Sequence, residues 1–498
     1  MPEKRRLQVY NTLTHQKENF IPLLESEQAE FVGMYSCGPT VYRSPTIGNY
    51  RAFFTADLIR NVLKYICGYP VKAVMNLTDV GHLTDDGDHG EDKLEKGAKR
   101  EGISAREVAK KYEEEFFNGL EKMHIERFDV MPKATDHIQQ QIEMIQALEE
   151  KGYTYTIPND GIYMDSSKVR EYGKLMGPNY KKRIENLNAG ERVEMGGKKN
   201  ATDFALWKFS PTQEKRQMER DSPRGIGFPG WHIECSAMSS EYLGKRFDLH
   251  HGGADHITVH HPNEIAQSES AFGYDEKHPR VNYRVHNQFL QVDGGKMGKS
   301  LGNAYTLEDL EAKGYSPLDL RYFYFMAQYA NFQNFTRDAL DQAKSTRKNL
   351  QKKIEKAVKE LSLDPNSFSL PTTLQDLIKE LPTQETTILA IDEALKDDFN
   401  TPKLIALLPT LVNSPTIEQL KVVLWLDQYI LKIGLFEDNT PSSSEISEIP
   451  AEIMDLANQR ATAKAEKNYT LADELRNQIQ EKGYDIKDIP GGFEIKKV

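Results

Sequence analysis

The chain has 498 residues, which is room for roughly three or four domains of ordinary size and excludes a single hydrophobic core. Hydrophobic residues make up 38% and charged residues 28%, which is typical of a soluble folded protein and excludes an intrinsically disordered one. No apolar run approaches the roughly 20 residues that cross a bilayer, and the first residues lack the apolar core of a signal peptide. We therefore expect a cytoplasmic protein that does not interact with a membrane.

The net charge of −11 runs against the basic excess that is typical of proteins that bind nucleic acid. A local basic face would still be compatible with such binding. One segment with a helical pattern carries seven basic residues: Lys344, Arg347, Lys348, Lys352, Lys353, Lys356 and Lys359. An ordinary solvated helix face is the alternative interpretation of this run.

The first part of the chain alternates strand and helix. Residues 31–37 and 71–77 have the apolar character of strands, and residues 50–66 between them have helical periodicity, with the helix beginning near Tyr50. This βαβ order predicts a parallel sheet. Ligands of such sheets bind at the carboxyl ends of the strands, so Cys37 and Thr78 are expected to face one crevice.

The rest of the chain departs from this alternation. Helical patterns are expected at 105–124 and 136–151, a hairpin that turns at Asn159–Gly161, strands near 246–250 and 281–292, mostly helices over 300–440, and one strong helix with a short glycine-rich end over 450–498. We predict an α/β fold in which a Rossmann-like catalytic domain is followed by a mostly helical domain. The expected parts are 1–125 and 206–295 (the two halves of the catalytic domain), 126–205 (an inserted connective module), 296–345 (a loop and stem-contact region), 346–440 (a helical bundle) and 441–498 (a linker and a small C-terminal unit).

Histidine, cysteine and carboxylate residues cluster in the second half of the predicted catalytic domain. Six of the 13 histidines fall between His232 and His261, close to Cys235 and Glu264. His260 and Glu264 are four residues apart at an expected helix start, so their side chains can converge. Cys37, Cys235, His260 and Glu264 together make a donor set that suits zinc.

The alternative interpretation of this cluster is structural. Cys37 and Cys235 can be small buried hydrophobic residues, with the histidines serving hydrogen bonds. The third cysteine, Cys67, lies at the end of a helical pattern and fits core packing. Three cysteines in a chain of this length argue against a disulfide framework.

Two short segments could hold phosphate groups. Lys296-Met297-Gly298-Lys299-Ser300 has glycines on both sides, and its two lysines can place positive charge against a polyphosphate. Thr46-Ile47-Gly48-Asn49 precedes a helix, whose first backbone N–H groups can bind an anion. A charged surface turn and simple helix capping are the respective alternatives.

Several sequence blocks, read in order, resemble those of the class I aminoacyl-tRNA synthetases, and specifically the cysteinyl-tRNA synthetase family. They are CGPTVY (37–42), NLTD (76–79), GWHIECSAM (230–238), FDLHHGGAD (247–255), HHPNEIAQS (260–268), KMGKSLGN (296–303) and DDFNTP (397–402). The resemblance covers nearly the whole chain, including a tail similar to the family's tRNA-binding end.

The resemblance implies a ligase that converts L-cysteine and ATP with Mg²⁺ into cysteinyl adenylate and transfers the cysteinyl group to the cognate cysteine tRNA. It implies one zinc ion held by Cys37, Cys235, His260 and Glu264. It also implies catalytic roles for Lys296, Lys299, Thr46 and Asn49. The implied ATP contacts are Lys299, Thr46, Gly48, Asn49 and Asp255, and the implied cysteine contacts are Cys37, Gly38, Thr78 and Trp231. We expect a monomer.

The chain departs from the family pattern at two signatures. The HIGH signature is Thr46-Ile47-Gly48-Asn49 here, so both imidazoles are missing, although Thr46 can still donate a hydrogen bond. The KMSKS signature is KMGKS, with Gly298 in place of serine, which predicts a more flexible loop. His232, His250 and His251 either line the nucleotide pocket or are structural.

Two other functions are compatible with parts of the sequence. A ligase of the same fold could pass activated cysteine to a small amine, but it would not need the helical extension after residue 345. A zinc-dependent thiol-binding protein without catalysis would fit the missing imidazoles, but it would not need the lysine loop.

Overall fold

A computed structural model describes residues 5–27, 29–80, 93–189, 197–210, 217–230, 232–275, 277–298, 301–437, 451–465, 468–489 and 492–497. The chain divides into two compact units, Met1–Phe436 and Glu437–Val498. None of the helices formed by the described residues combines the length and apolarity that a membrane span needs.

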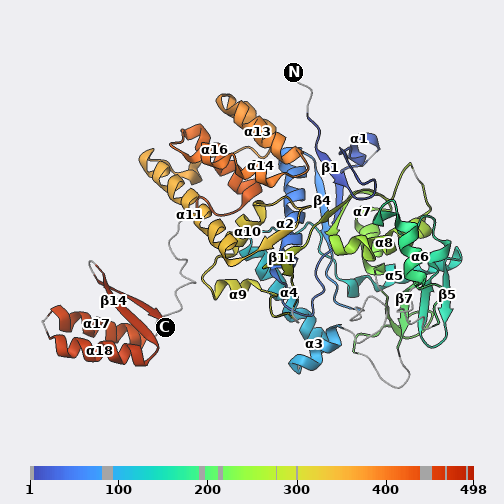
Figure 1. Cartoon of the computed structure of the whole chain (residues 1–498), viewed down its shortest axis with the longest axis horizontal. Coiled ribbons are helices and arrows are strands. Elements are labelled where there is room, and N and C mark those ends of the chain that lie inside the picture. Colours follow the sequence, from blue (N-terminus) through green and yellow to red (C-terminus); the bar gives the residue numbers. More distant parts are fainter. Residues whose placement is uncertain are drawn as a thin grey trace. The chain divides into compact units, whose positions relative to one another are not determined.

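A parallel four-stranded sheet lies at the centre of the first unit and confirms the expected topology. Its strand order is β10-β9-β3-β4. The strands are β3 (Val32–Ser36), β4 (Val71–Met75), β9 (Phe247–Gly253) and β10 (Val281–Asn287). Figure 1 shows helix α2 (Ile47–Asn61) on one side of this sheet and α7 (Ile233–Leu243) and α8 (His260–Phe272) on the other. This is the two-faced covering that parallel sheets require.

Helix α2 buries the stripe that its periodicity predicted, including Phe54 and Leu58. The helix begins at Ile47, not near Tyr50 as expected. The Thr46 side chain accepts from the Asn49 N–H while the Asn49 side chain accepts from the Thr46 N–H. This capping box starts the helix three residues before the expected position.

An antiparallel sheet with its own hydrophobic cluster occupies the stretch between the two halves of the parallel sheet. Its order is β5-β6-β7-β8, and Leu148, Met164 and Trp207 are buried in the cluster. The expected hairpin is confirmed, since Ile157 pairs with Gly161. The elements of this stretch are α5 (Ile138–Glu150), β5 (Thr154–Ile157), β6 (Gly161–Met164), α6 (Tyr180–Ala189), β7 (Phe204–Phe209) and β8 (Gly227–Pro229).

The segment expected as one strand over 281–292 is two strands separated by Gln288 and Phe289. The first is β10, and the second, β11 (Leu290–Val292), pairs with β12 (Gly295–Lys296) and β13 (Gln333–Phe335) in a separate three-stranded sheet. The remaining elements outside the bundle are β1 (Gln8–Asn11), β2 (Gln16–Asn19), α1 (Leu23–Ser26), α3 (Lys93–Glu101), α4 (Ala105–Lys122), α9 (Leu307–Glu311) and α10 (Pro317–Phe325).

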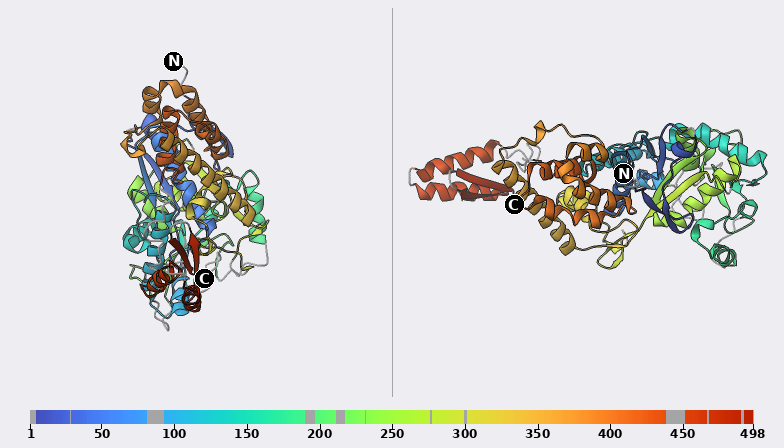
Figure 2. Two further views of the ribbon diagram at one scale, coloured as in Figure 1. Left: turned by 90° about the vertical axis from the view of Figure 1, so that its left-hand side faces the viewer. Right: turned by 90° about the horizontal axis from the view of Figure 1, so that it is seen from above.

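Helices follow from residue 337 to residue 431, as expected, and Figure 2 shows them in orange, packed together as a bundle. They are α11 (Arg337–Glu360), α12 (Leu374–Glu380), α13 (Glu385–Lys396), α14 (Thr401–Ile405), α15 (Leu408–Val412), α16 (Ile417–Leu426) and the π-helical turn η9 (Asp427–Leu431).

The second unit differs from the single helix expected over 450–498. It contains two helices, α17 (Ala451–Ala465) and α18 (Tyr469–Glu481), and a β-hairpin of β14 (Tyr484–Ile489) and β15 (Gly492–Lys497). Asn468 caps α18 by accepting from the Leu471 N–H, which separates the two helices. The alternating pattern of the hairpin was obscured by its charged residues.

Candidate functional site

Four donor side chains converge beyond the carboxyl end of β3. Cys37 directly follows that strand, and Cys235 lies in the first turn of α7. His260 and Glu264 lie at the start of α8. One donor atom from each of the four lies within 4.8 Å of the others. The structure therefore brings together the donor set that was expected to bind a metal.

Local structure explains how each donor is held. The Cys37 N–H donates to the His251 carbonyl at 3.1 Å and so extends the pairing of β3 with β9 by one residue. Because α8 begins at His260, Glu264 lies one turn later on the same face, with His260 Nε2 3.0 Å from Glu264 Oε1.

The donor atoms fit a metal ion such as zinc. His260 Nε2 is buried and faces Glu264 Oε1, 3.0 Å away, and Cys235, so it is directed at the other donors of the set. The opposite nitrogen, Nδ1, contacts His232. Two thiols, one imidazole and one carboxylate are the ligand types that zinc binds in proteins.

Electrostatics at the four donors also favours a cation. Burial raises the pKa of Cys37 to about 11, so its thiolate requires stabilisation by a positive charge. Burial opposes ionisation of Glu264 too, but contacts with His250 and His260 hold the pKa of that carboxyl well below its usual range. The site thus contains one fixed negative charge and two thiols that a divalent ion can ionise.

Further histidines surround the four donors and were not expected in this role. His250 Nε2 lies 2.7 Å from Glu264 Oε2, the carboxylate oxygen that faces away from His260. His261 lies 3.5 Å from Cys37 Sγ through Nε2 and 2.7 Å from His286 through Nδ1. Histidines that orient ligands in this way are common around metal sites.

A second set of donors, Cys37, His250, His261 and Glu264, is equally compact. Its His250 Nε2 is already engaged with Glu264 Oε2 at 2.7 Å, whereas His260 Nε2 makes no well-aligned hydrogen bond to the described residues. We therefore assign His250 and His261 to orienting roles. His251 is 1% exposed and contacts Ser36 Oγ at 2.9 Å, which favours the structural interpretation over a place in a nucleotide pocket.

The start of α2 and the lysine loop lie against each other. A Cβ placed on Gly48 would come within 2.7 Å of Met297 Cε, so the two signature segments are in close contact. Lys296 is exposed on β12. Asn303 closes the loop by accepting from the Gly298 N–H at 2.8 Å and donating to the Lys296 carbonyl at 3.2 Å. Lys299 and Ser300 lie outside the described residues.

The ends of β3 and β4 meet, as the sheet topology predicted. The Thr78 N–H donates to the Pro39 carbonyl at 3.0 Å. Asn76 was not singled out in the sequence, although it opens the NLTD block: it accepts from the Gly38 N–H at 2.9 Å and donates to Thr78 Oγ1 at 3.0 Å. A Cβ on Gly38 would lie 1.8 Å from the Asn76 carbonyl oxygen, so only glycine fits there.

Of two other residues expected to contact the substrates, the structure describes one. Asp255 is exposed on a 3₁₀ turn, Ala254–Ile257, directly after β9. Trp231 lies outside the described residues.

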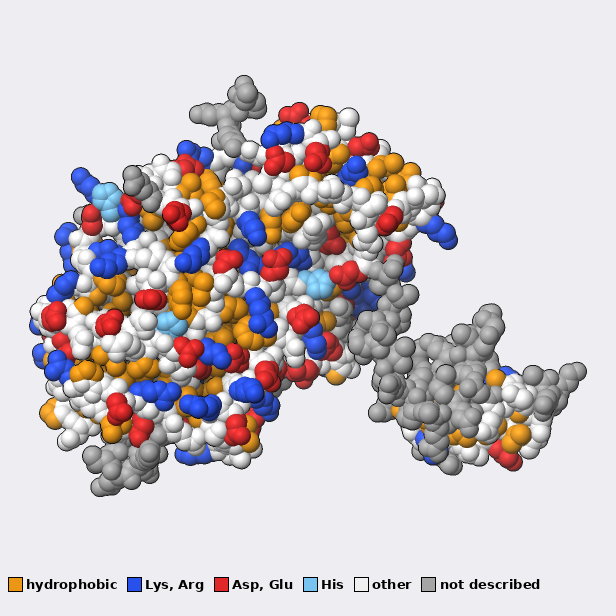
Figure 3. Space-filling view, turned by 180° about the vertical axis from the view of Figure 1, so that it is seen from behind, with side chains coloured by type: hydrophobic (Ala, Val, Ile, Leu, Met, Phe, Trp, Pro, Cys, Tyr) orange, Lys and Arg blue, Asp and Glu red, His pale blue; other side chains and the backbone are white. Residues whose placement is uncertain are grey.

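The basic run on α11 is only partly a surface. Arg347 is 5% exposed and binds Asp319 Oδ1 at 2.8 Å and the Ile433 carbonyl at 3.0 Å. Its expected place on a basic face is therefore wrong. Lys348, Lys352 and Lys356 are exposed. On the face shown in Figure 3, acidic and basic side chains are interspersed.

Comparison with known proteins places this site in a family. Residues 23–345 match the model of the catalytic domain of class I (C) tRNA synthetases. The chain is 42% identical to a cysteine–tRNA ligase of Treponema denticola over 99% of this chain and 100% of the relative. It is 38% identical to a cysteine–tRNA ligase of Thermococcus onnurineus over 99% of each chain.

A solved structure supports the fold. The methionyl-tRNA synthetase of Mycobacterium tuberculosis, in complex with methionyl-adenylate, aligns with a TM-score of 0.52 at 15% identity, over 81% of this chain and 89% of that chain. The chain therefore belongs to the cysteine–tRNA ligase family of class I tRNA synthetases.

Proposed function

We propose that the chain activates L-cysteine with ATP and Mg²⁺ and transfers the cysteinyl group to the 3′ end of its cognate tRNA. The observation that carries this proposal is the convergence of Cys37, Cys235, His260 and Glu264 at the sheet edge from which the chain enters α2. Relatives of full length are named cysteine–tRNA ligases, which supports the same activity.

In the first step, a carboxylate oxygen of cysteine bonds to the α-phosphorus of ATP, and the bond from that phosphorus to the bridging oxygen breaks to release pyrophosphate. Negative charge accumulates on the phosphate oxygens, so catalysis rests on positioning and on fixed positive groups and not on a nucleophilic side chain. Lys296 and Lys299 stabilise the leaving pyrophosphate. Thr46, Gly48 and Asn49 hold the nucleotide phosphates at the start of α2, and Asp255 contacts ATP.

The missing imidazoles change how the start of α2 contributes. Thr46 and Asn49 satisfy each other in the capping box, so they act mainly by holding the first turn of α2 in place. The Ile47 N–H donates to the Tyr305 carbonyl and the Asn49 N–H to Thr46, so the Gly48 N–H and the positive end of the helix dipole then supply the interaction with phosphate.

The cysteine pocket consists of Cys37, Gly38, Thr78 and Trp231. Zinc held by Cys37, Cys235, His260 and Glu264 would supply a position for the thiolate of cysteine, a soft ligand that the hydroxyl of serine does not match. A pocket without a metal would separate two side chains this similar by only about 10- to 200-fold. Asn76 orients Gly38 and Thr78 against each other.

We assign tRNA binding to the bundle of residues 346–440 and to residues 441–498. The exposed lysines of α11, Lys348, Lys352 and Lys356, provide positive charge for the phosphate backbone.

Cysteine-dependent exchange of labelled pyrophosphate into ATP tests the proposal. We expect exchange with cysteine, none with serine, and loss of exchange after zinc is chelated. Aminoacylation of cysteine tRNA then identifies the acceptor. Absence of exchange under every condition would contradict adenylate formation and favour a thiol-binding protein.

A further inference from the structure

Arg51 is a charged residue in the core of the first unit. It lies in α2, 2% exposed, and among the described residues it has no carboxylate within ion-pair distance. Its guanidinium donates to five backbone carbonyls, at N–O distances of 2.7–3.5 Å: those of Gln288, Phe289, Gln328, Tyr329 and Asn331. Burial lowers the pKa of Arg51 to about 10, so it stays charged at neutral pH.

These carbonyls belong to two segments, each of which leads directly into a strand. Gln288 and Phe289 precede β11, and Asn331 lies two residues before β13. The two strands are parallel neighbours, with Leu290 opposite Gln333. One side chain therefore fixes the starting ends of both strands, and β11 in turn carries the β12 hairpin on which Lys296 lies.

The other end of this connection is the first turn of α2. Arg51 lies two residues after Asn49, and the same turn contacts the lysine loop through Gly48 and Met297. Arg51 thus joins α2 to the start of β11, while Gly48 meets Met297, which directly follows β12.

The segment that receives Arg51 is itself held from the helical bundle. Asp398, in the turn before α14, accepts from Tyr329 Oη at 2.8 Å, from Gln328 Nε2 at 3.2 Å and from the Tyr10 N–H at 2.9 Å. Asp398 and Phe399 both have positive φ, +56° in each case, which is costly for residues other than glycine. Three of the five carbonyls that bind Arg51, those of Gln328, Tyr329 and Asn331, therefore lie in a segment that is anchored to the bundle.

We propose that Arg51 is a positioning residue for adenylate formation, setting the distance between the first turn of α2 and the hairpin that carries Lys296. This inference rests on the proposed function, in which the two segments act on the same phosphates. A guanidinium suits the role because its planar fork reaches several carbonyls at once, whereas lysine offers one ammonium group.

Amide hydrogen exchange tests, without an activity assay, whether Arg51 holds the strands β11, β12 and β13 in place. In Arg51→Lys, amide exchange in β11, β12 and β13 is expected to rise by about tenfold or more while the parallel sheet stays protected. Arg347→Lys is the matched control, because Arg347 is also buried and also binds a carbonyl, but in the bundle. Unchanged exchange at the three strands in Arg51→Lys would overturn the proposal. Arg51→Gln provides a second variant should the lysine variant not fold.

A double-mutant cycle tests the catalytic part. Arg51→Lys is expected to lower kcat of pyrophosphate exchange by about 10- to 100-fold with little change in KM for cysteine. In a Lys296→Ala background the same change should have a much smaller effect, because there is no longer a lysine to position. If the two substitutions lower kcat by independent factors that multiply in the double variant, a positioning role is refuted. Absence of pyrophosphate exchange in the unmodified chain would instead refute the proposed function. The hydrogen-exchange comparison would still decide whether Arg51 holds the strands in place.

Discussion

At the scale of single residues, the donors of the candidate metal centre differ in what already binds them. Glu264 is held through one oxygen by His250 and faces His260 with the other. Cys235 is 2% exposed. His260 Nε2 makes no well-aligned hydrogen bond to the part of the chain that the structure describes. A donor set that is oriented but incompletely satisfied is what a bound ion would complete.

Replacing Cys235 by serine removes one thiol from this set. We expect Cys235→Ser to lose zinc and to bind cysteine more weakly, with its preference for cysteine over serine falling to the roughly 10- to 200-fold range of a pocket without a metal. Metal analysis and exchange kinetics with both amino acids measure these effects. Cys67→Ser is the control, because Cys67 packs against the core away from the four donors. Full zinc content and undiminished cysteine affinity in Cys235→Ser would contradict the assignment.

At the scale of elements, the contact between α2 and the lysine loop depends on a residue without a side chain. Gly48 lies inside α2, where glycine is a poor helix former, and its Cα faces the end of Met297. The glycine is therefore explained by close approach and not by helix stability.

Gly48→Ala separates these two effects. Its Cβ would lie 2.7 Å from Met297 Cε, so the loop must shift, and we expect kcat of exchange to fall by about tenfold. Stability should stay the same or rise by up to about 1 kcal/mol, because alanine favours the helix. Shortening the neighbour in Gly48→Ala/Met297→Ala should recover part of the activity. A wild-type rate of pyrophosphate exchange in Gly48→Ala would show that the contact does not matter for catalysis.

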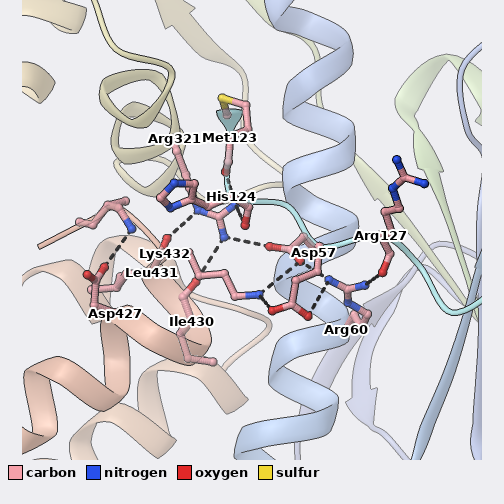
Figure 4. Close-up of polar contacts among 12 residues, drawn as sticks. Asp57, Arg60, Met123, His124, Arg127, Arg321, Asp427, Ile430, Leu431 and Lys432 are labelled. Atoms are coloured by element: carbon pink, nitrogen blue, oxygen red, sulfur yellow. Dashed lines mark hydrogen bonds and ion pairs between the residues drawn. The ribbon is translucent and has the colours of Figure 1, made fainter. Parts of the chain in front are cut away.

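Helix α2 is also joined to more distant elements through a buried ion network. Figure 4 shows Asp57 between three cations, with Arg321 Nη2 at 2.8 Å, Arg60 Nη2 at 2.6 Å and Lys432 Nζ at 3.9 Å. Arg321 comes from α10 and also donates to the Leu431 carbonyl of η9 at 2.6 Å. At the scale of the whole first unit, this network joins α2 and α10 to the end of the bundle.

Removing the central charge takes away the carboxylate that pairs with the buried Arg321 and Arg60, while Lys432 still binds Glu126. We expect Asp57→Asn to lower the free energy of unfolding of the first unit by about 3–5 kcal/mol, measured by denaturant titration. Asp376→Asn, which changes an exposed carboxylate that binds Lys379, should leave the unfolding midpoint unchanged. Equal midpoints for Asp57→Asn and the unmodified chain would contradict a stabilising role.

The same network predicts a pH dependence. Burial opposes ionisation of Asp57, but Lys432, Arg321 and Arg60 hold the pKa of its carboxyl well below the usual range. Its contribution is therefore fully present above the unfolded-state pKa of about 3.9 and is lost as the pH falls below it. Acid destabilisation should be weaker in Asp57→Asn than in the unmodified chain when both are followed by unfolding between pH 6 and pH 3.

Sequence alone determined what depends on neighbours along the chain. The periodicity of residues 50–66, the four-residue spacing of His260 and Glu264 and the hairpin at Asn159–Gly161 reflect local geometry, and the order of strands and helix implied the parallel sheet. Tertiary structure decided what depends on contacts between distant segments. Arg51 binds carbonyls more than 230 residues away, Asp57 pairs with Arg321, and Arg347 turns from a surface residue into a core one. Burial and pairing of a charge are properties of its three-dimensional surroundings, so a local pattern carries no signal for them.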